Sequence, residues 1–251
     1  MFDEALAWTV EEACFNAWPS LRQNLNGGWA GRFAPGVSRR ANSVNLLRQD
    51  YERLDHRIAL FERLYRDQGL PPLFRALSFF DPAFEAALSA RGYSIEGETR
   101  TLLTTAPPQG EPAPGVELTP RPDAAWLSAM QRFHGRTPAQ AETYARIVEA
   151  LTLPAAFAAA RTEAGEIAAL GYVAVHEGLW CVESVVTGPE FRGQGFSRRM
   201  LEALAGWAAG QGAHTGCLQV EAGNASAIRL YSRLGFTREL YRYRYWRAPE
   251  G

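Results

Sequence analysis

The chain has 251 residues, of which 47% are apolar, and its formal net charge is −1. This length is comfortable for two domains with packed cores, which excludes a largely disordered chain. The nearly balanced charge argues against a dedicated nucleic-acid binder, because such a protein needs a surface that neutralises phosphates.

The sequence shows no signal for membrane insertion, export or metal binding. No apolar run is long enough to cross a bilayer, and the N-terminus has no basic region followed by an apolar stretch. We therefore expect a cytoplasmic protein without membrane contact. Cys14, Cys181 and Cys217 are far apart in the chain and form no Cys-x-x-Cys pair. We expect neither a metal site nor a disulfide framework from them.

A proline-rich stretch over residues 106–115 divides the chain. Proline at this density cannot propagate a helix or a central strand, so the stretch is predicted to be a semi-rigid linker. It separates an N-terminal domain over residues 1–105 from a C-terminal domain over residues 116–251.

The N-terminal domain is predicted to mix helices and strands. In chain order we expect a helix over 2–18, a strand over 29–33, a helix over 51–65, a strand over 73–79, a helix starting at Asp81-Pro82 and a strand over 99–104. The helix over 51–65 is the clearest, because its apolar residues share one face. Asp81 is the predicted N-cap of the helix that follows it.

The C-terminal domain is predicted to follow the order β-αα-β-β-β-α-β-α-β. The elements are strand 115–118, helices 122–133 and 139–150, strands 155–161, 166–176 and 179–187, a helix through 200–207, strand 216–221, helix 224–234 and strand 238–246. The fold class is therefore α/β with a mixed sheet.

The most informative stretch is the glycine turn between the strand over 179–187 and the helix that follows it. A strand that turns through Gly193 and Gly195 straight into a helix leaves several backbone N–H groups pointing out of the turn. Together with the positive end of the helix dipole, these donors form an anion site, so a ligand that carries phosphates is expected. The Rossmann fingerprint and the Walker A loop do not fit, because the third glycine and the Gly-Lys-Ser/Thr end are missing.

Two motifs give the chain a resemblance to the GNAT superfamily of acyl-CoA-dependent N-acyltransferases. The first is that family's pyrophosphate loop R/Q-x-x-G-x-G/A, which is similar to Arg192-Gly193-Gln194-Gly195-Phe196-Ser197. Ser197 departs from the family's Gly or Ala, but it is small and can donate to a phosphate. The second motif is the helix Asn224-Ala225-Ser226-Ala227-Ile228-Arg229-Leu230-Tyr231, followed by Leu234-Gly235-Phe236.

The resemblance implies a GNAT fold and acetyl-CoA as co-substrate. It places the pyrophosphate on Arg192, Gly193, Gln194, Gly195, Phe196 and Ser197. It places the thioester and pantetheine on backbone amides of Val185, Val186 and Thr187. Asn224 would cap its helix and lie beside the CoA arm, and Tyr231 would give a proton to the departing sulfur. Glycines in the loop would let the backbone approach the phosphates without an intervening Cβ.

The general base is expected among two glutamates. Glu183 shares a strand face with Val185 and Thr187 by period two, and this face should open on the acetyl group. Glu221, at the end of the next strand, is the second candidate. The alternative interpretation is that both are solvated or ion-paired groups at strand ends.

We expect an N-acetyltransferase that acts on a primary amine of a small molecule or peptide by direct attack on the thioester. The alternative is a non-catalytic acyl-CoA-binding or sensor protein. The rhythm of helix, strand, helix, Gly-Tyr and strand over residues 50–104 echoes the C-terminal domain. It predicts a second, degenerate GNAT-like half without a phosphate loop. Residues 39–45 are expected to be structural or to help shape the acceptor site.

Overall fold

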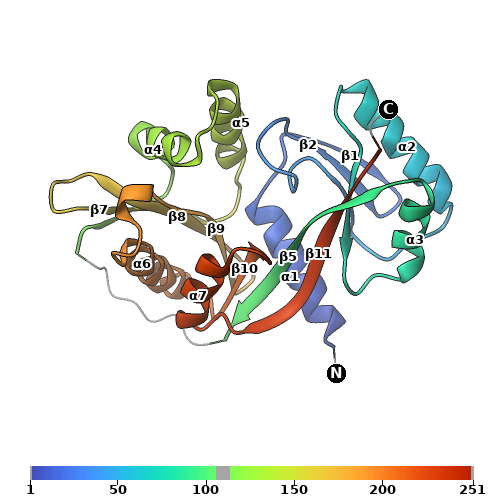
Figure 1. The fold of residues 1–251 in the computed structure, drawn as a ribbon. Helices are drawn as coiled ribbons and strands as arrows, with labels where there is room; N and C mark the ends of the chain where they lie inside the picture. Colours follow the sequence, from blue (N-terminus) through green and yellow to red (C-terminus); the bar gives the residue numbers. More distant parts are fainter. Residues whose placement is uncertain (1, 106–113, 250–251) are drawn as a thin grey trace. The chain divides into compact units, whose positions relative to one another are not determined.

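The computed structural model describes residues 2–105 and 114–249 (Figure 1). Its elements are α1 Glu4–Ala17, β1 Arg22–Asn26, β2 Trp29–Phe33, β3 Val44–Leu46, α2 Leu54–Asp67, β4 Leu73–Leu77, α3 Pro82–Ala90, β5 Ser94–Thr104, β6 Val116–Thr119, α4 Ala124–His134, α5 Pro138–Glu149, β7 Ala155–Arg161, β8 Ile167–His176, β9 Leu179–Thr187, the short 3-10 helix η1 Pro189–Phe191, α6 Phe196–Gly210, β10 Thr215–Glu221, α7 Ala225–Arg233 and β11 Arg238–Arg247. The predicted elements are confirmed, whereas β1, β3 and η1 were not predicted. Most of the predicted linker, residues 106–113, lies outside the described residues.

The described chain forms two compact units whose boundaries differ from those of the two predicted domains. Unit 1 contains residues 1–19, 101–220 and 224–240, and unit 2 contains residues 20–100, 221–223 and 241–251. The first helix therefore belongs with the second half of the sequence, where the Tyr172 hydroxyl donates to the Ala17 carbonyl at 2.8 Å. The last strand belongs largely with the first half, because residues 243–247 of β11 pair with β4.

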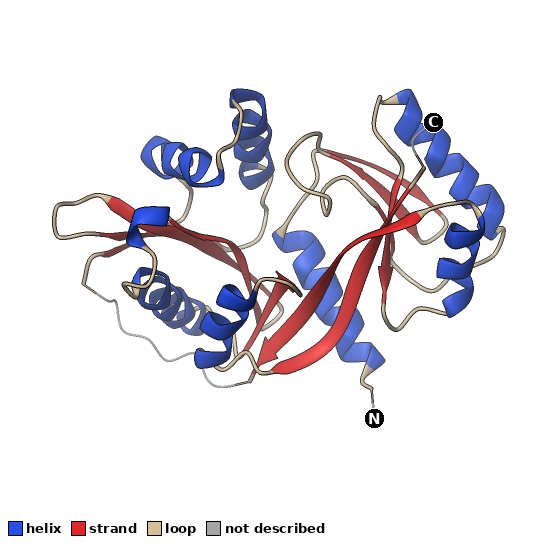
Figure 2. Cartoon of the chain, viewed as in Figure 1, coloured by secondary structure: helices blue, strands red, loops and turns tan. Residues whose placement is uncertain are grey.

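Unit 1 is a mixed sheet with helices on both faces (Figures 1 and 2). Its strand order is β5-β10-β9-β8-β7-β6, in which β9 and β10 are parallel and β6 to β9 are antiparallel. Helices α6 and α7 cover one face, α4 and α5 cover the other, and α1 packs against β8 and β9. The main core lies on the α6 face, where Met200 and Leu204 pack against Val182 and Val173. Burial of these apolar side chains is the main force that holds helix and sheet together.

Unit 2 has the strand order β1-β2-β3-β4-β11, in which β3 and β4 are parallel. Its core is aromatic: Trp29 stacks on Phe61 with centroids 6.0 Å apart and meets Phe84 edge-on at 5.5 Å. Asp81 caps α3 as predicted, accepting from the Ala83 amide at 2.8 Å.

The same order of elements occurs in both halves of the sequence. The series β3-α2-β4-α3-β5 parallels β9-α6-β10-α7-β11, and in each series the first two strands are parallel neighbours. The last strand of each series is exchanged, because the strand beside β4 is β11 and the strand beside β10 is β5. This exchange explains why the compact units do not follow the halves of the sequence.

Candidate functional site

Strand β9 carries a bulge that the sequence pattern did not predict. Tyr172 of β8 is opposite Glu183, but Leu170 is opposite Val186, so β9 has one extra residue in this stretch. The bulge is at Ser184, whose φ of 55° is a left-handed backbone conformation that residues other than glycine rarely adopt. The prediction that Glu183 and Val185 share a face is therefore wrong. Val185 packs with Val182 in the α6-side core, whereas Glu183 points to the other face with Tyr172.

Strands β9 and β10 separate just before the bulge. Their parallel pairing ends at Leu218 and Val182, although β9 continues to Thr187. Within the described residues, the β10-facing edge of β9 from Glu183 to Thr187 thus has no strand partner. The backbone of Val185, Val186 and Thr187 lies on this free edge, where its polar groups are available to a ligand.

The glycine turn has the conformation that an anion site requires. Gly193 and Gly195 have φ values of 78° and 83°, and Gly195 stands as the N-cap of α6 without a side-chain cap. Among the described backbone hydrogen bonds outside helices, none uses the amides from Gly193 to Arg198. Residues 192–195 are exposed. The free amides and the helix dipole together favour an anion.

The backbone conformation gives a reason for glycine that does not depend on a bound phosphate. A Cβ on Gly193 would have no atom within 4 Å, and one on Gly195 would approach only the Arg199 guanidinium at 3.7 Å. Left-handed φ, which costs an L-residue about 1–2 kcal/mol, is what requires glycine at these two positions in the described structure.

The start of α6 is fixed to the end of β9. Phe196 is buried, and the Ser197 hydroxyl forms a close hydrogen bond with the Thr187 hydroxyl. Arg199 lies over the Phe196 ring at 4.7 Å. The serine that departs from the expected Gly or Ala therefore ties the turn to the sheet.

Helix α7 positions Asn224 and Tyr231. Asn224 is the N-cap, as predicted, and its Oδ1 accepts from the Ala227 amide at 3.1 Å. Tyr231 is the one buried residue of α7, with 8% of its surface exposed. Its ring lies 6.1 Å from that of Phe236, which in turn meets Trp180 at 5.3 Å. The aromatic contacts hold the tyrosine in a fixed place.

The Tyr231 hydroxyl is protonated and is not engaged in a hydrogen bond with the described residues. Burial, and then the negative charge of Glu183, raise the pKa of Tyr231 well above its usual range. This electrostatic effect requires the two side chains to lie near each other, although they come from opposite faces of the sheet.

The two glutamate candidates have different surroundings. Glu183 is buried, with 6% of its surface exposed, and faces the α4 and α5 side. Glu221 belongs to unit 2, where its exposed carboxylate pairs with Arg39 at 2.5 Å. The ion-paired alternative therefore holds for Glu221, and the role of Glu183 as the base stays a prediction.

Two residues near Glu183 were not predicted. Tyr144 of α5 is fully buried, and the guanidinium of Arg136 lies over its ring at 4.1 Å. Burial is the main cause that raises the pKa of Tyr144 above its usual range, and the negative charge of Glu183 adds to this effect. A side-chain interaction with Ser184 and the positive charge of Arg136 act in the opposite direction. No motif marks either residue, because they reach β9 only through the packing of α4 and α5.

The three cysteines, far apart in the sequence, lie together in unit 1. Cys181 and Cys217 are opposite each other on β9 and β10 with sulfurs 3.0 Å apart, and Cys14 of α1 lies 3.9 Å from Cys217. All three sulfurs lie within 4.8 Å of one another, close enough for one metal ion to bridge. Hydrogen bonding to Cys14 and burial raise the pKa of Cys181 and Cys217, which favours neutral thiols. Sequence distance was thus a poor guide to their arrangement.

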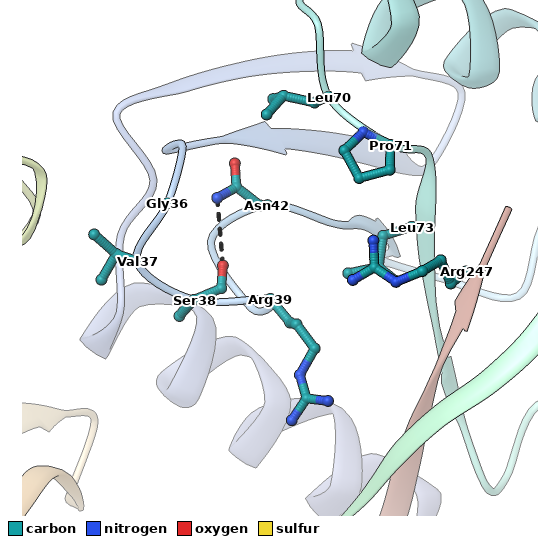
Figure 3. Close-up of a pocket in the computed structure, with 9 residues that line it drawn as sticks. All are labelled: Gly36, Val37, Ser38, Arg39, Asn42, Leu70, Pro71, Leu73 and Arg247. Carbon is teal, nitrogen blue, oxygen red and sulfur yellow. Dashed lines mark hydrogen bonds between the residues drawn. The ribbon is translucent and has the colours of Figure 1, made fainter. Parts of the chain in front are cut away.

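Residues 39–45 have structural contacts in unit 2, where a cavity of about 290 Å³ opens beside them (Figure 3). The cavity is lined by segment 36–39 and by Asn42, Leu70, Pro71, Leu73 and Arg247. The Asn42 side chain accepts from the Ala34 amide at 2.7 Å, and Arg39 pairs with Glu96 at 3.3 Å. The segment is thereby held in place by its own polar groups. Whether it shapes an acceptor site stays a prediction.

Among the described residues, no helix has the length and apolar character needed to span a membrane.

Comparisons of the sequence and the fold with known proteins all indicate one family. The chain matches the family described as "Probable histone acetyltransferase Rv0428c C-terminal" over residues 7–246. It is 26% identical over 235 residues to the "Uncharacterized N-acetyltransferase YobR" of Bacillus subtilis (strain 168), covering 91% of this chain and 93% of that protein. It is 32% identical over 90 residues to the ribosomal protein bS18-alanine N-acetyltransferase of Escherichia coli (strain K12), covering 36% and 61%. A GCN5-related N-acetyltransferase from Kribbella flavida shares the fold, with a TM-score of 0.68 at 15% identity over 98% of this chain and 95% of that chain.

Proposed function

This chain belongs to the GNAT family of N-acetyltransferases, and from that premise we propose that it transfers an acetyl group from acetyl-CoA to the primary amine of a small molecule or peptide. The observation that carries the proposal is the buried Tyr231 side chain, whose hydroxyl has no hydrogen-bond partner among the described residues and lies near enough to Glu183 for that charge to raise its pKa.

The described residues fit acetyl-CoA. The amides from Gly193 to Arg198 would bind the pyrophosphate at the start of α6, with Arg192 and Gln194 exposed at the rim. The free edge of β9 at Val185, Val186 and Thr187 would hold the pantetheine through main-chain groups, and Asn224 would lie beside the CoA arm while capping α7. Acetyl-CoA supplies an acetyl group activated as a thioester.

The side chains divide the proton transfers between them. Glu183, on the α4 and α5 side, would accept a proton from the acceptor amine, directly or through water. Tyr231, on the α6 and α7 side, would donate its proton to the departing sulfur, since a raised pKa keeps the hydroxyl protonated at neutral pH. The two groups thus serve opposite ends of the same displacement.

The test is Tyr231→Phe, which removes the hydroxyl and keeps the ring contacts. We expect kcat to fall about 10²-fold or more, because a positioned general acid contributes on this order. The acetyl-CoA Kd should stay within about twofold of wild type. Free thiol release over an amine panel gives the rate, and calorimetry gives the Kd. Unchanged turnover would remove Tyr231 from the mechanism, and acetyl-CoA binding without turnover of any amine in the wild type would favour the binding or sensor protein.

We also propose that the β3-α2-β4-α3-β5 half is a degenerate GNAT-like half without a cofactor. The link between β3 and α2 has no glycine, and Arg53 stands left-handed at the helix start, with φ 54° and no side-chain cap. Asp50 pairs with Arg57 of the first turn at 2.7 Å. A carboxylate therefore takes the place where the other half offers free amides to a phosphate.

The stoichiometry of binding tests this proposal. Calorimetric titration of the full chain should give one acetyl-CoA per chain, and Arg57→Gln should leave the number and the Kd unchanged. Two sites per chain would contradict the degenerate half.

A further inference from the structure

The guanidinium of Arg136 forms no ion pair with a carboxylate among the described residues. It stands in the short link between α4 and α5 and is half-buried. Other arginines of comparable burial pair with carboxylates, as Arg91 does with Asp55 and Arg161 with Glu117, both at 3.0 Å. Arg136 has no such ion pair, and its Nη1 is buried without a hydrogen-bond partner. Burying a guanidinium in this way is unfavourable unless something else pairs with it.

Tyr144 has a second buried polar atom without a partner at the same place. Its hydroxyl is buried and has no partner at hydrogen-bond geometry, although Ser184 lies near enough to lower its pKa, and its ring lies under the Arg136 guanidinium at 4.1 Å. Two unsatisfied groups that lie in contact with each other call for an explanation, such as a ligand that completes them.

The pair lies on the face of the sheet that Glu183 takes, and the proposed mechanism brings the acceptor amine to this face. Tyr144 packs on Trp126, Trp126 on Phe157, and Phe157 on Tyr172, which is opposite Glu183 across β8 and β9. The link that carries Arg136 is held over the end of β9, because the ring of Phe133 lies 2.8 Å from where a Cβ on Gly188 would stand. The charges of both Arg136 and Glu183 act on Tyr144. Arg136 and Glu183 therefore both lie close to Tyr144.

From this geometry we propose that the acceptor carries a carboxylate as well as its reactive amine, and that Arg136 binds that carboxylate while Tyr144 holds the guanidinium. The inference rests on the proposed acetyltransferase function. An amine near Glu183 and a carboxylate at Arg136 describe an amino acid or a short peptide with a free carboxyl end. A planar guanidinium suits this group, because it binds a carboxylate through two parallel hydrogen bonds.

The experiment compares free amino acids and dipeptides with their C-terminal amides. The readout is kcat/KM from thiol release with acetyl-CoA, expressed as the acid-to-amide ratio. Arg136→Gln should lower this ratio at least tenfold while kcat/KM for the amides stays within twofold. Comparing the ratio between enzymes cancels the difference in amine pKa between an acid and its amide. Arg132→Gln is the matched control: Arg132 is an exposed neighbour on α4 that lies over the Phe133 ring at 4.9 Å, and its loss should leave the ratio unchanged.

An unchanged ratio in Arg136→Gln, or an equal loss for acids and amides, would overturn the inference. A second readout does not need turnover: calorimetric binding of the same acids and amides to the enzyme with CoA. If no amine is acetylated but acids bind at least tenfold more tightly than amides, and only in the presence of Arg136, the proposed function fails and the assignment of Arg136 as a carboxylate-binding residue stands. Equal binding of acid and amide, or binding of neither, would refute it.

Discussion

At the residue scale, burial separates the two glutamates that the sequence offered as bases. Glu183 is buried beside Tyr231, whereas Glu221 is exposed and paired with Arg39. Glu183→Gln keeps the shape and removes the base, so we expect kcat/KM to fall about 10²-fold and the rise of rate with pH to flatten. Glu221→Gln is the control and should retain the wild-type profile, because its carboxylate is already held by an arginine. Initial rates across pH decide between them. A wild-type profile for Glu183→Gln would leave proton removal to water alone.

At the element scale, the start of α6 depends on a backbone conformation that only glycine adopts at little cost. Gly195→Ala should destabilise the turn by about 1–2 kcal/mol, and since 1.4 kcal/mol is a factor of ten, the acetyl-CoA Kd should rise about tenfold. Gly210→Ala is the matched control in the same helix, because Gly210 has no positive φ and a Cβ there would meet no atom within 4 Å. Its Kd should equal that of wild type. Calorimetry measures both values, and an unchanged Kd in Gly195→Ala would show that the turn does not bind the cofactor.

At the scale of the whole molecule, buried tyrosines make stability depend on pH. Burial raises the pKa of Tyr65, Tyr144, Tyr231 and Tyr245 above the usual 10. A pKa that is higher in the folded state than in the unfolded one contributes stability that is fully present below about pH 10 and is lost as pH rises further. We therefore expect the tyrosines to cause no change in the free energy of unfolding, measured in urea, between pH 8 and pH 9. Above pH 10 this free energy should fall. Tyr231→Phe should reduce the slope. A free energy that does not fall above pH 10 would contradict the burial of these hydroxyls.

The amino-acid sequence by itself determined all the helices and strands except β1, β3 and η1, together with the glycine turn, the Asn224 cap and the family, because these depend on local spacing and on short motifs. Arg192, Gly195 and Tyr231 belong to short motifs that can be recognised without knowing how the rest of the chain folds. Only the tertiary structure decided which face Glu183 takes, because one extra residue at Ser184 shifts the period-two pattern and nothing local marks it. The exchange of β5 and β11, the meeting of three distant cysteines and the position of Arg136 over Tyr144 are likewise long-range pairings. Such pairings are set by the free energy of packing whole elements together, so they do not leave a mark in any single stretch of sequence.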